Sequence, residues 1–302
     1  MIFLWYNKFV VSMKYIFLVN IFSFKEDINK LRNNIKEYCK KEKVSYEIEI
    51  NSEFNSVEDI LKKYKKTRNV IFSIGGDGTL NRIINELVKT DNVIGVIPYG
   101  TGNDFYKTMK EQFKKGINKC DLIKINNKYF INTACFGIDA DIAYNKEHIT
   151  SKLIPRSQKY NYSIIKTFFS FRPRYFEINI NDQVIKDKFA TVIVSNGRYY
   201  GNGFNIGVKS ELNNDLFDVY LVKDVNRLAL INVILKIKKG KHENDKNIIK
   251  FTTNKFNLKI NEEVKANIDG EVLNGNEFNI EVLDKKLEVF YDEKLIKNIR
   301  KI

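Results

Sequence analysis

The chain has 302 residues, of which 43% are hydrophobic and 29% are charged. This composition is typical of soluble globular proteins and excludes a disordered or fibrous chain, and the length favours two domains over one. The formal net charge is +14, which either a lysine-rich composition or attraction to an anion, such as a nucleotide or an acidic membrane surface, would explain. RNA is not favoured, because the aromatic residues are not interleaved with basic ones.

The cysteines and the N-terminal region bear on where the protein acts. Cys39, Cys120 and Cys135 form no CxxC pair and no metal-binding spacing, so we expect reduced thiols in a cytoplasmic protein. The longest apolar stretches are far shorter than the roughly 20 residues of a transmembrane helix. Lysines interrupt the N-terminal apolar region and no small-residue cleavage site follows it, so it does not predict a signal peptide. Met13 is an alternative start, which would make residues 1–12 an extension.

The first part of the chain alternates strands and helices. Apolar residues at helical spacing in 26–43 predict a helix, whereas the continuous apolar run 69–74 is typical of a buried parallel strand. The expected elements are strand 14–20, helix 26–43, strand 44–50, helix 57–64, strand 69–74, helix 80–89 and strand 92–97. This order predicts an α/β domain with an open, mainly parallel sheet and helices on both faces. We assign residues 1–122 to this α/β domain.

The rest of the chain predicts a mainly antiparallel β-sandwich, because many short strands follow one another with tight turns. The expected strands are a pair within 124–138 and the segments 175–180, 188–196, 216–222, 248–260, 264–268, 277–283 and 287–291, with helices over 157–170 and 226–238. We assign residues 123–302 to this β-sandwich domain. The tail 292–302 predicts a short helix that packs back on the first domain.

The motif GGDGT (75–79) joins a strand to a helix. Glycines there permit positive φ and close backbone approach, and the start of a helix attracts anions through its N–H groups. Thr79 stands where an N-cap hydroxyl is expected. A carboxylate beside a phosphate is repulsive unless a cation or a sugar hydroxyl intervenes, so Asp77 suggests a nucleotide with magnesium. The alternative is a plain glycine-rich turn.

A second loop, PYGTGNDF (98–105), follows the next strand. Ligands bind open α/β sheets at the carboxyl ends of strands, so two such loops from neighbouring strands would converge on one ligand. The alternative for Asn103 and Asp104 is a helix cap. In the second domain, the Asp-Gly of VKANIDGEVL (264–273) is by itself a hairpin signal. The segment NNDLFD (213–218) clusters oxygen ligands suited to a hard cation.

Five motifs occur in one order: GGDGTLN, PYGTGNDF, FGIDA (136–140), SNGRYYGNG (195–203) and IDGE (268–271). In this order they resemble the catalytic family of diacylglycerol kinases, bacterial lipid kinases whose fold is related to that of NAD kinase and phosphofructokinase. The resemblance covers nearly the whole chain from about residue 14. The motif GGDGT alone does not separate these kinases, but PYGTGNDF and the late IDGE favour the lipid kinases.

The resemblance implies ATP between the two domains and a set of residues for each role. ATP would be bound by Asn20, Gly75, Gly76, Asp77, Gly78, Thr79, Asn81, Gly100, Thr101, Asn103 and Asp104. Asp269 would be the general base and Glu271 its neighbour in a metal network, and Glu211, Asn214 and Leu216 would hold a structural Mg²⁺, partly through backbone carbonyls. The chain departs from the family pattern at three places. The first loop reads NIFSFK (20–25), and Arg82 stands where the family commonly has Glu. In the metal loop Asn214-Asp215 replaces the usual Asp-Gly, so Asp215 or Asp218 would have to supply the missing charged ligand.

The function expected from these features is transfer of the γ-phosphate of ATP to a hydroxyl group of diacylglycerol or a related lipid. The alternatives are a soluble kinase of the NAD kinase type and a nucleotide-binding regulator without catalysis. A Ser-His or Cys-His mechanism has little support, because neither histidine lies in a glycine motif. A cytoplasmic enzyme with a long-chain substrate must reach the inner face of the cell membrane as a peripheral protein. No nucleic acid is expected as a partner, and a homodimer is left open.

Two segments are candidates for membrane contact. The segment 226–242 is an apolar helix that ends in four lysines, Lys236, Lys238, Lys239 and Lys241. The segment FFSFRPR (168–174) places aromatic residues beside two arginines. The alternatives are a helix packed on the core with solvated lysines and aromatic core residues at the end of a helix.

Overall fold

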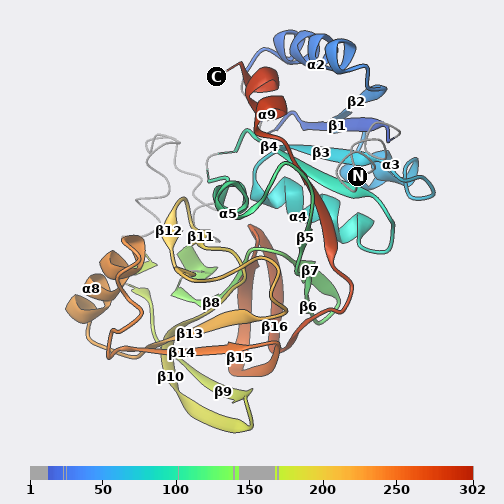
Figure 1. Cartoon of the computed structure of the whole chain (residues 1–302). Coiled ribbons are helices and arrows are strands. Elements are labelled where there is room, and N and C mark those ends of the chain that lie inside the picture. The colour runs from blue at the N-terminus through green and yellow to red at the C-terminus, as the bar shows by residue number, and fades with distance from the viewer. Residues whose placement is uncertain are drawn as a thin grey trace. The chain divides into compact units, whose positions relative to one another are not determined.

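The computed structural model describes residues 13–22, 24, 26–100, 102–138, 140–142, 167–168 and 170–301 (Figure 1). The expected extension 1–12, Thr101 and most of the expected helix 157–170 lie outside the described residues. The chain divides into two compact units, unit 1 with residues Met1–Cys120 and Lys285–Ile302, and unit 2 with residues Asp121–Asp284. None of the helices in the described part of the chain is long and apolar enough to cross a bilayer.

Unit 1 is the expected α/β unit with a six-stranded, mainly parallel sheet. Its elements are β1 (Tyr15–Asn20), α2 (Ile28–Glu42), β2 (Tyr46–Asn51), α3 (Val57–Lys62), β3 (Val70–Gly75), α4 (Asp77–Leu87), β4 (Val93–Pro98), α5 (Asp104–Gln112), β5 (Gly116–Cys120), β17 (Leu287–Tyr291) and α9 (Glu293–Arg300). The strand order is β2-β1-β3-β4-β17-β5, and only the β17–β5 pair is antiparallel. The continuous burial of β3 and β4 confirms that their apolar runs are central parallel strands.

The C-terminal strand β17 corrects one expectation. The segment 287–291 was expected among the antiparallel strands, but it pairs parallel with β4 in the sheet of unit 1 (Figure 1). The apolar residues of 287–291 predict a strand, but they do not predict which strand it pairs with. In the structure β17 is mostly buried and forms its hydrogen-bonded ladder with β4. The helix α9 follows in unit 1, where the Asn34 side-chain amide on α2 donates to the carbonyl of Ile299 at 2.8 Å.

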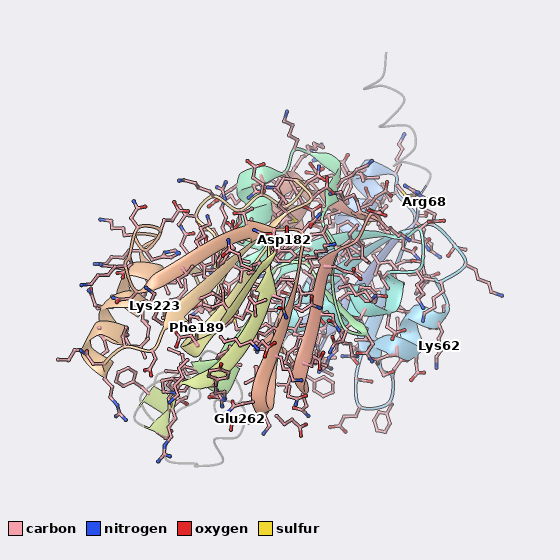
Figure 2. All side chains as sticks on the ribbon, turned by 90° about the horizontal axis from the view of Figure 1, so that it is seen from below. Lys62, Arg68, Asp182, Phe189, Lys223 and Glu262 are labelled. Carbon is pink, nitrogen blue, oxygen red and sulfur yellow. The ribbon has the colours of Figure 1, made fainter. Side chains whose placement is uncertain are left out.

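Unit 2 is the expected antiparallel β unit. Its elements are β6 (Ile123–Ile125), β7 (Lys128–Phe130), β8 (Thr133–Gly137), β9 (Arg174–Ile180), β10 (Gln183–Ser195), β11 (Tyr199–Tyr200), β12 (Phe204–Asn205), β13 (Phe217–Lys223), α8 (Arg227–Lys238), β14 (Ile248–Thr253), β15 (Lys255–Ile268) and β16 (Glu271–Val282). The main order is β14-β13-β10-β8-β15-β16-β6-β7. Because β9 pairs with both β10 and β15, the pairings of β10, β8, β15 and β9 close into a ring. Figure 2 labels Asp182 at the β9–β10 turn and Glu262 in the middle of β15.

Two strand boundaries differ from the expected ones. The run 248–260 is two strands, β14 and β15, because the chain turns at Asn254. The strand β15 then continues through the separately expected 264–268, with a shift of register between Lys259 and Val264. An irregularity of this kind is not readable from alternation alone, because it moves the apolar side chains out of a strict period of two.

Unit 2 has a hydrophobic core on each side of its central strands. Phe136, Val192 and Leu221 point into one core, and their neighbours Cys135, Ile193 and Tyr220 point into the other. Both faces of β8, of β13 and of the second half of β10 (189–195) are therefore buried, which explains why these segments are mainly apolar runs rather than alternating patterns. The helix α8 covers the second core with Leu230, Val233 and Ile237.

Gly95 in the middle of β4 is required by the packing of unit 1. A Cβ at this position would lie 2.3 Å from Cδ1 of Phe72, whose ring stacks on Phe17 with centroids 4.8 Å apart. We expect Gly95→Ala to lower the free energy of unfolding by about 1–3 kcal/mol, because the added methyl group overpacks a filled core. Urea denaturation measures the loss. Phe72→Leu in the same chain removes the clashing ring and should recover part of it, and an equal loss in both backgrounds would contradict the packing explanation.

Candidate active site

Three neighbouring parallel strands of unit 1 end at one edge of the sheet. They are β1, which ends at Asn20, β3, which ends at Gly75, and β4, which ends at Pro98. Their loops bring together most of the expected nucleotide-binding residues, namely Asn20, Gly75, Gly76, Asp77, Gly78, Thr79, Gly100, Asn103 and Asp104. Asn81 lies one turn further along α4, where its Oδ1 accepts from the side chain of Asn85, and Thr101 lies outside the described residues.

The two glycine loops touch through their backbones. The carbonyl of Gly75 accepts the N–H groups of Tyr99 and Gly100, both at 3.1 Å. A Cβ on Gly100 would lie 2.4 Å from Cα of Gly76, so only glycine fits at Gly100. Gly76 itself has an ordinary φ of −98°, and a Cβ there would lie 3.4 Å from Cα of Gly100. The loops can therefore approach this closely only because the second one carries a glycine at this point.

The helix α4 begins inside the GGDGT motif rather than after it. Its first residue is Asp77 and its N-cap is Gly76, which has no side chain to cap the helix. The expectation that Thr79 is the N-cap is therefore wrong. Thr79 lies in the first turn, where its hydroxyl accepts from the Asn20 side-chain amide at 2.7 Å. A helix start without a side-chain cap presents backbone N–H groups and partial positive charge to an anion.

Asp77 connects the first loop to the second one. Its carboxylate accepts the backbone N–H groups of Asp104 at 3.1 Å and Phe105 at 3.2 Å, which belong to the first turn of α5. Asn103, the N-cap residue of α5, makes no capping bond, because its amide instead exchanges two hydrogen bonds with Gly100 at 2.9 and 2.7 Å. The cap of α5 is thus supplied from the GGDGT motif, and both carboxylate oxygens of Asp77 are engaged by protein N–H groups.

The pKa of Asp77 is raised to about 6, mainly by burial and then by the nearby Asp104 carboxylate, and the two N–H donors offset part of this rise. Asp104 in turn pairs with Lys107, whose ammonium lies 2.9 Å from it. A raised pKa means that the folded protein holds the proton on Asp77 more tightly than the unfolded chain does. Burial and the Asp104 carboxylate therefore oppose ionisation of Asp77, whereas its two hydrogen bonds to α5 favour it.

The expected catalytic residue Asp269 lies in the turn between β15 and β16 of unit 2. It is 5% exposed and adopts a φ of +48°. Its carboxylate accepts three consecutive backbone N–H groups, those of Ile131 at 2.9 Å, Asn132 at 3.2 Å and Thr133 at 2.7 Å. Glu271 follows as the first residue of β16 and is half-buried. Hydrogen bonds of this kind stabilise the ionised carboxylate and fix the turn that carries Glu271.

Two buried asparagines that sequence reasoning missed lie beside this turn. The Asn132 side-chain amide donates to the carbonyl of Tyr199 at 3.0 Å, and that of Asn196 donates to the carbonyl of Ile131 at 2.6 Å. Within the described residues, the side-chain oxygens of Asn132 and Asn196 accept no hydrogen bond. Asn196 belongs to the glycine-rich segment SNGRYYGNG, so the motif itself was the available signal.

The expected magnesium loop is anchored by a carboxylate that the sequence did not indicate. Asp121 is fully buried and accepts the N–H groups of Asn214 at 2.9 Å and Asp215 at 3.0 Å. The side-chain oxygen of Asn214 accepts the N–H of Leu216 at 3.1 Å. Asp218, considered as a substitute ligand, instead binds Ser210, Thr252 and Lys250.

The donor set of this loop is composed of oxygen atoms, which fits a hard cation in kind. Glu211 and Asp215 are exposed carboxylates, and the loop also offers backbone carbonyls. However, the described residues contain no group of three or more His, Cys, Asp or Glu side chains placed to hold a metal ion. The residues therefore fit Mg²⁺ only through a mixture of side-chain and main-chain oxygens.

The raised pKa of Asp77 predicts a pH dependence of stability. An Asp carboxyl with an ordinary pKa of 3.8 in the unfolded chain and about 6 in the folded one stabilises the protein fully below pH 4, and this contribution is lost as the pH rises to about 6. The loss is at most about 3 kcal/mol, because each pKa unit corresponds to about 1.4 kcal/mol. Urea denaturation of the wild type and of Asp77→Asn at several pH values isolates it. A difference between the two proteins that stays constant from pH 4 to pH 7 would contradict the raised pKa.

Comparison with known proteins agrees with this architecture. The model of the diacylglycerol kinase catalytic domain matches residues 14–129, and that of the YegS C-terminal NAD kinase beta sandwich-like domain matches residues 132–291. A diacylglycerol kinase of Bacillus subtilis (strain 168) is 29% identical over 217 residues, which cover 67% of this chain and 71% of the relative. Solved structures from Bacillus anthracis str. Sterne share the fold.

One of these structures, described as "a putative diacylglycerol kinase", superposes with a TM-score of 0.74 at 19% identity and covers 93% of this chain and 96% of its own. Another, described as a diacylglycerol kinase, superposes with a TM-score of 0.66 at 18% identity and covers 93% of this chain and 98% of its own. Likenesses at this identity show the fold alone, whereas the second family model spans more than half of the chain. With the five motifs in the same order, the chain belongs to the family in which a diacylglycerol kinase catalytic domain is followed by a YegS C-terminal NAD kinase beta sandwich-like domain.

Proposed function

We propose that this protein transfers the γ-phosphoryl group of ATP to the hydroxyl group of diacylglycerol or a related lipid. The proposal rests on one observation: at one edge of the unit 1 sheet, two glycine loops are in backbone contact, and the helix α4 begins there without a side-chain cap. Membership of the diacylglycerol kinase catalytic family supports phosphoryl transfer, and the names of its relatives support a lipid acceptor.

The nucleotide phosphates are expected on the backbone of Gly75 to Thr79. The N–H groups at the start of α4 and the helix dipole favour negative charge there. The carboxylate of Asp77 does not oppose this binding as the sequence suggested, because both of its oxygens accept N–H groups of α5. Asn20 adds an amide next to Thr79, which lines the same edge of the sheet.

The acceptor hydroxyl must lose its proton as it attacks the γ-phosphorus atom. The turn with Asp269 and Glu271 supplies two carboxylates for this role. Asp269 is our first assignment for the base, but its three N–H donors also make it the residue that positions the turn. Glu271, which is half-buried, is the second assignment, and the two are separated by experiment.

Magnesium is part of the proposal in two places. Mg²⁺ supplied with ATP would neutralise negative charge on the phosphates. Glu211, Asn214 and the Leu216 carbonyl would hold a structural ion at the loop that Asp121 anchors. Since Asn214 is neutral and its side-chain oxygen already accepts an N–H group, we expect this loop to bind Mg²⁺ weakly.

A lipid acceptor with long chains implies that the enzyme works as a peripheral protein at an anionic membrane surface. The two candidate segments differ in this respect. Phe168 and Phe171 pack against the second core of unit 2, and Arg174 pairs with Asp141 and Glu262, so this segment serves the fold. The helix α8 retains an exposed face, which makes it the better candidate.

Incubation of the protein with labelled ATP, Mg²⁺ and a total lipid extract tests the function. A labelled phospholipid-like product that requires the extract supports a lipid kinase. Labelled NADP formed from added NAD would instead support a soluble kinase of the NAD kinase type. ATP binding without any turnover would support a regulator and would contradict the proposal.

Substitution at Gly76 tests the nucleotide site. We expect Gly76→Val to fold, because a Cβ there meets only Cα of Gly100 at 3.4 Å, and to bind ATP at least about tenfold more weakly, because the side chain enters the space next to the helix start. Calorimetry measures the affinity. Gly100→Ala serves as the contrasting variant, because its Cβ would meet Gly76 and disturb the fold itself. Unchanged ATP affinity in folded Gly76→Val would contradict a phosphate site at GGDGT and would leave the motif as a plain glycine-rich turn.

The two carboxylates of the IDGE turn make separable predictions. Replacement of a general base lowers the rate by about 10²–10⁴-fold at unchanged ATP affinity. We expect this for Asp269→Asn if Asp269 is the base, together with a loss of stability, because an amide cannot accept all three N–H groups. If Asp269 only positions the turn, Glu271→Gln shows the larger kinetic loss without a loss of stability. Glu277→Gln, an exposed residue on the same strand, is the control. Losses below tenfold in both variants would remove this turn from the chemistry.

A further inference from the structure

The helix α8 is apolar on two opposite faces. One face, formed by Leu230, Val233 and Ile237, is buried on the second core of unit 2. On the other face, Leu228 is 81% exposed, Ile231 42% and Leu235 51%. Spacings of three and four residues place these side chains in one row along the helix. No other helix or strand in the described part of the chain exposes three large apolar side chains.

Basic residues surround this exposed row. The helix sequence RLALINVILKIK contains no acidic residue, and Arg227, Lys238, Lys239 and Lys241 are exposed at its ends. Figure 2 shows a further lysine, Lys223, at the end of β13, just before the helix. Asp224, between Lys223 and the helix, is the one acidic residue in 223–242, so the net charge next to the apolar row is positive.

The acidic residues that follow the helix are already paired. Asp245 lies 2.7 Å from the ammonium of Lys236, and Glu243 lies 3.0 Å from that of Lys209 and 3.1 Å from that of Lys250. Of the four lysines in the segment, Lys236 is therefore engaged within the protein, and Lys238 lies 5.9 Å from the ring centroid of Phe204. Arg227 lies over the ring of Phe168, and the exposed Lys239 and Lys241 lie beyond the C-terminal end of the helix, where they can face a negatively charged partner.

An anionic bilayer fits this surface better than a protein does. Cores of protein interfaces are depleted in lysine, and a stable dimer buries roughly 800 Å² on each partner, far more than three aliphatic side chains offer. A helix with an apolar face next to lysines instead matches interfacial helices, which lie in the plane of the membrane. At twelve residues, α8 is also too short to span the bilayer, which needs about 20.

We propose that α8 docks unit 2 on an anionic bilayer, with Leu228, Ile231 and Leu235 inserted below the headgroups and the flanking lysines at the phosphate level. The inference identifies the membrane-contacting element of the proposed lipid kinase, and in that sense it rests on the proposed function. Binding is then primarily hydrophobic, and the lysines orient the helix. Each basic residue near an anionic surface contributes about a fivefold factor at most, and salt screens it.

The test uses the full chain and vesicles of phosphatidylcholine with or without phosphatidylglycerol. We expect the double variant Leu228→Gln and Leu235→Gln to bind phosphatidylglycerol vesicles at least tenfold more weakly than the wild type in co-sedimentation. Val184→Gln is the matched control, because Val184 is 60% exposed on β10, away from α8, and its loss should leave binding unchanged. Thermal unfolding of each variant verifies that the surface changes do not alter the fold.

A spectroscopic arm locates the contact directly. The only tryptophan is Trp5, so Leu235→Trp in a Trp5→Phe background reports on α8 alone. Brominated phosphatidylglycerol should quench this tryptophan, whereas Val184→Trp in the same background should not be quenched. Equal binding by the double variant, or quenching at Val184 but not at Leu235, would overturn the proposal. So would a concentration-dependent dimer that the double variant abolishes, because a second copy of the chain would then be the occupant.

The same variants separate this inference from the proposed function. Phosphorylation of a short-chain, water-soluble diacylglycerol does not require membrane docking. The double variant should phosphorylate it at the wild-type rate while losing activity on vesicles. If neither protein phosphorylates the short-chain substrate, the proposed function fails, and vesicle binding still decides the role of α8.

Discussion

The contact between the backbones of Gly76 and Gly100 is the constraint on which the unit 1 site depends. A Cβ on Gly100 would come within 2.4 Å of Gly76, so the loops after β3 and β4 can meet only without a side chain there. Their contact brings Asp77 to the first turn of α5 and leaves the start of α4 without a side-chain cap. The same glycines therefore hold the fold together and open the surface on which we place the phosphates.

Three buried or half-buried aspartates share one structural device. Asp77 accepts the N–H groups of two consecutive residues, Asp121 also accepts two, and Asp269 accepts three. Each carboxylate thus completes the hydrogen bonding of a segment distant in sequence, where backbone N–H groups would otherwise be buried without partners. A motif aspartate in this chain is consequently a structural residue as well as a candidate for chemistry, and its replacement changes geometry together with charge.

Unit 2 explains why one helix can be apolar on both sides. The strands β8 and β13 and the second half of β10 have two buried faces, and α8 is needed to cover the second one. One apolar row of α8 satisfies that requirement, so the opposite row, Leu228, Ile231 and Leu235, has no packing role within the described residues. Monomeric soluble proteins rarely expose aliphatic side chains in a group, so such a group indicates a surface that contacts a partner or a membrane.

The sequence by itself determined the order and type of the main elements and the family. Local patterns carry this information: apolar runs identify β3 and β4, helical spacing identifies α2, and glycine motifs mark the loops that follow the strands. The edge where Asn20, Thr79 and Gly100 meet also followed from sequence, because the carboxyl ends of neighbouring parallel strands lie at one edge.

Only the tertiary structure decided which partners these residues have. The segment of β17 carries a strand pattern, but the vacancy beside β4 that it fills is a property of the assembled sheet. The sequence predicts Thr79 as the N-cap, but the helix starts at Asp77 and Thr79 lies in its first turn. Asp121 belongs to no motif, although it anchors the loop of Asn214. Strand partners, caps and buried carboxylate contacts join residues far apart in the chain, so no local pattern encodes them. They are settled by which N–H groups and apolar faces remain to be satisfied once the fold has formed.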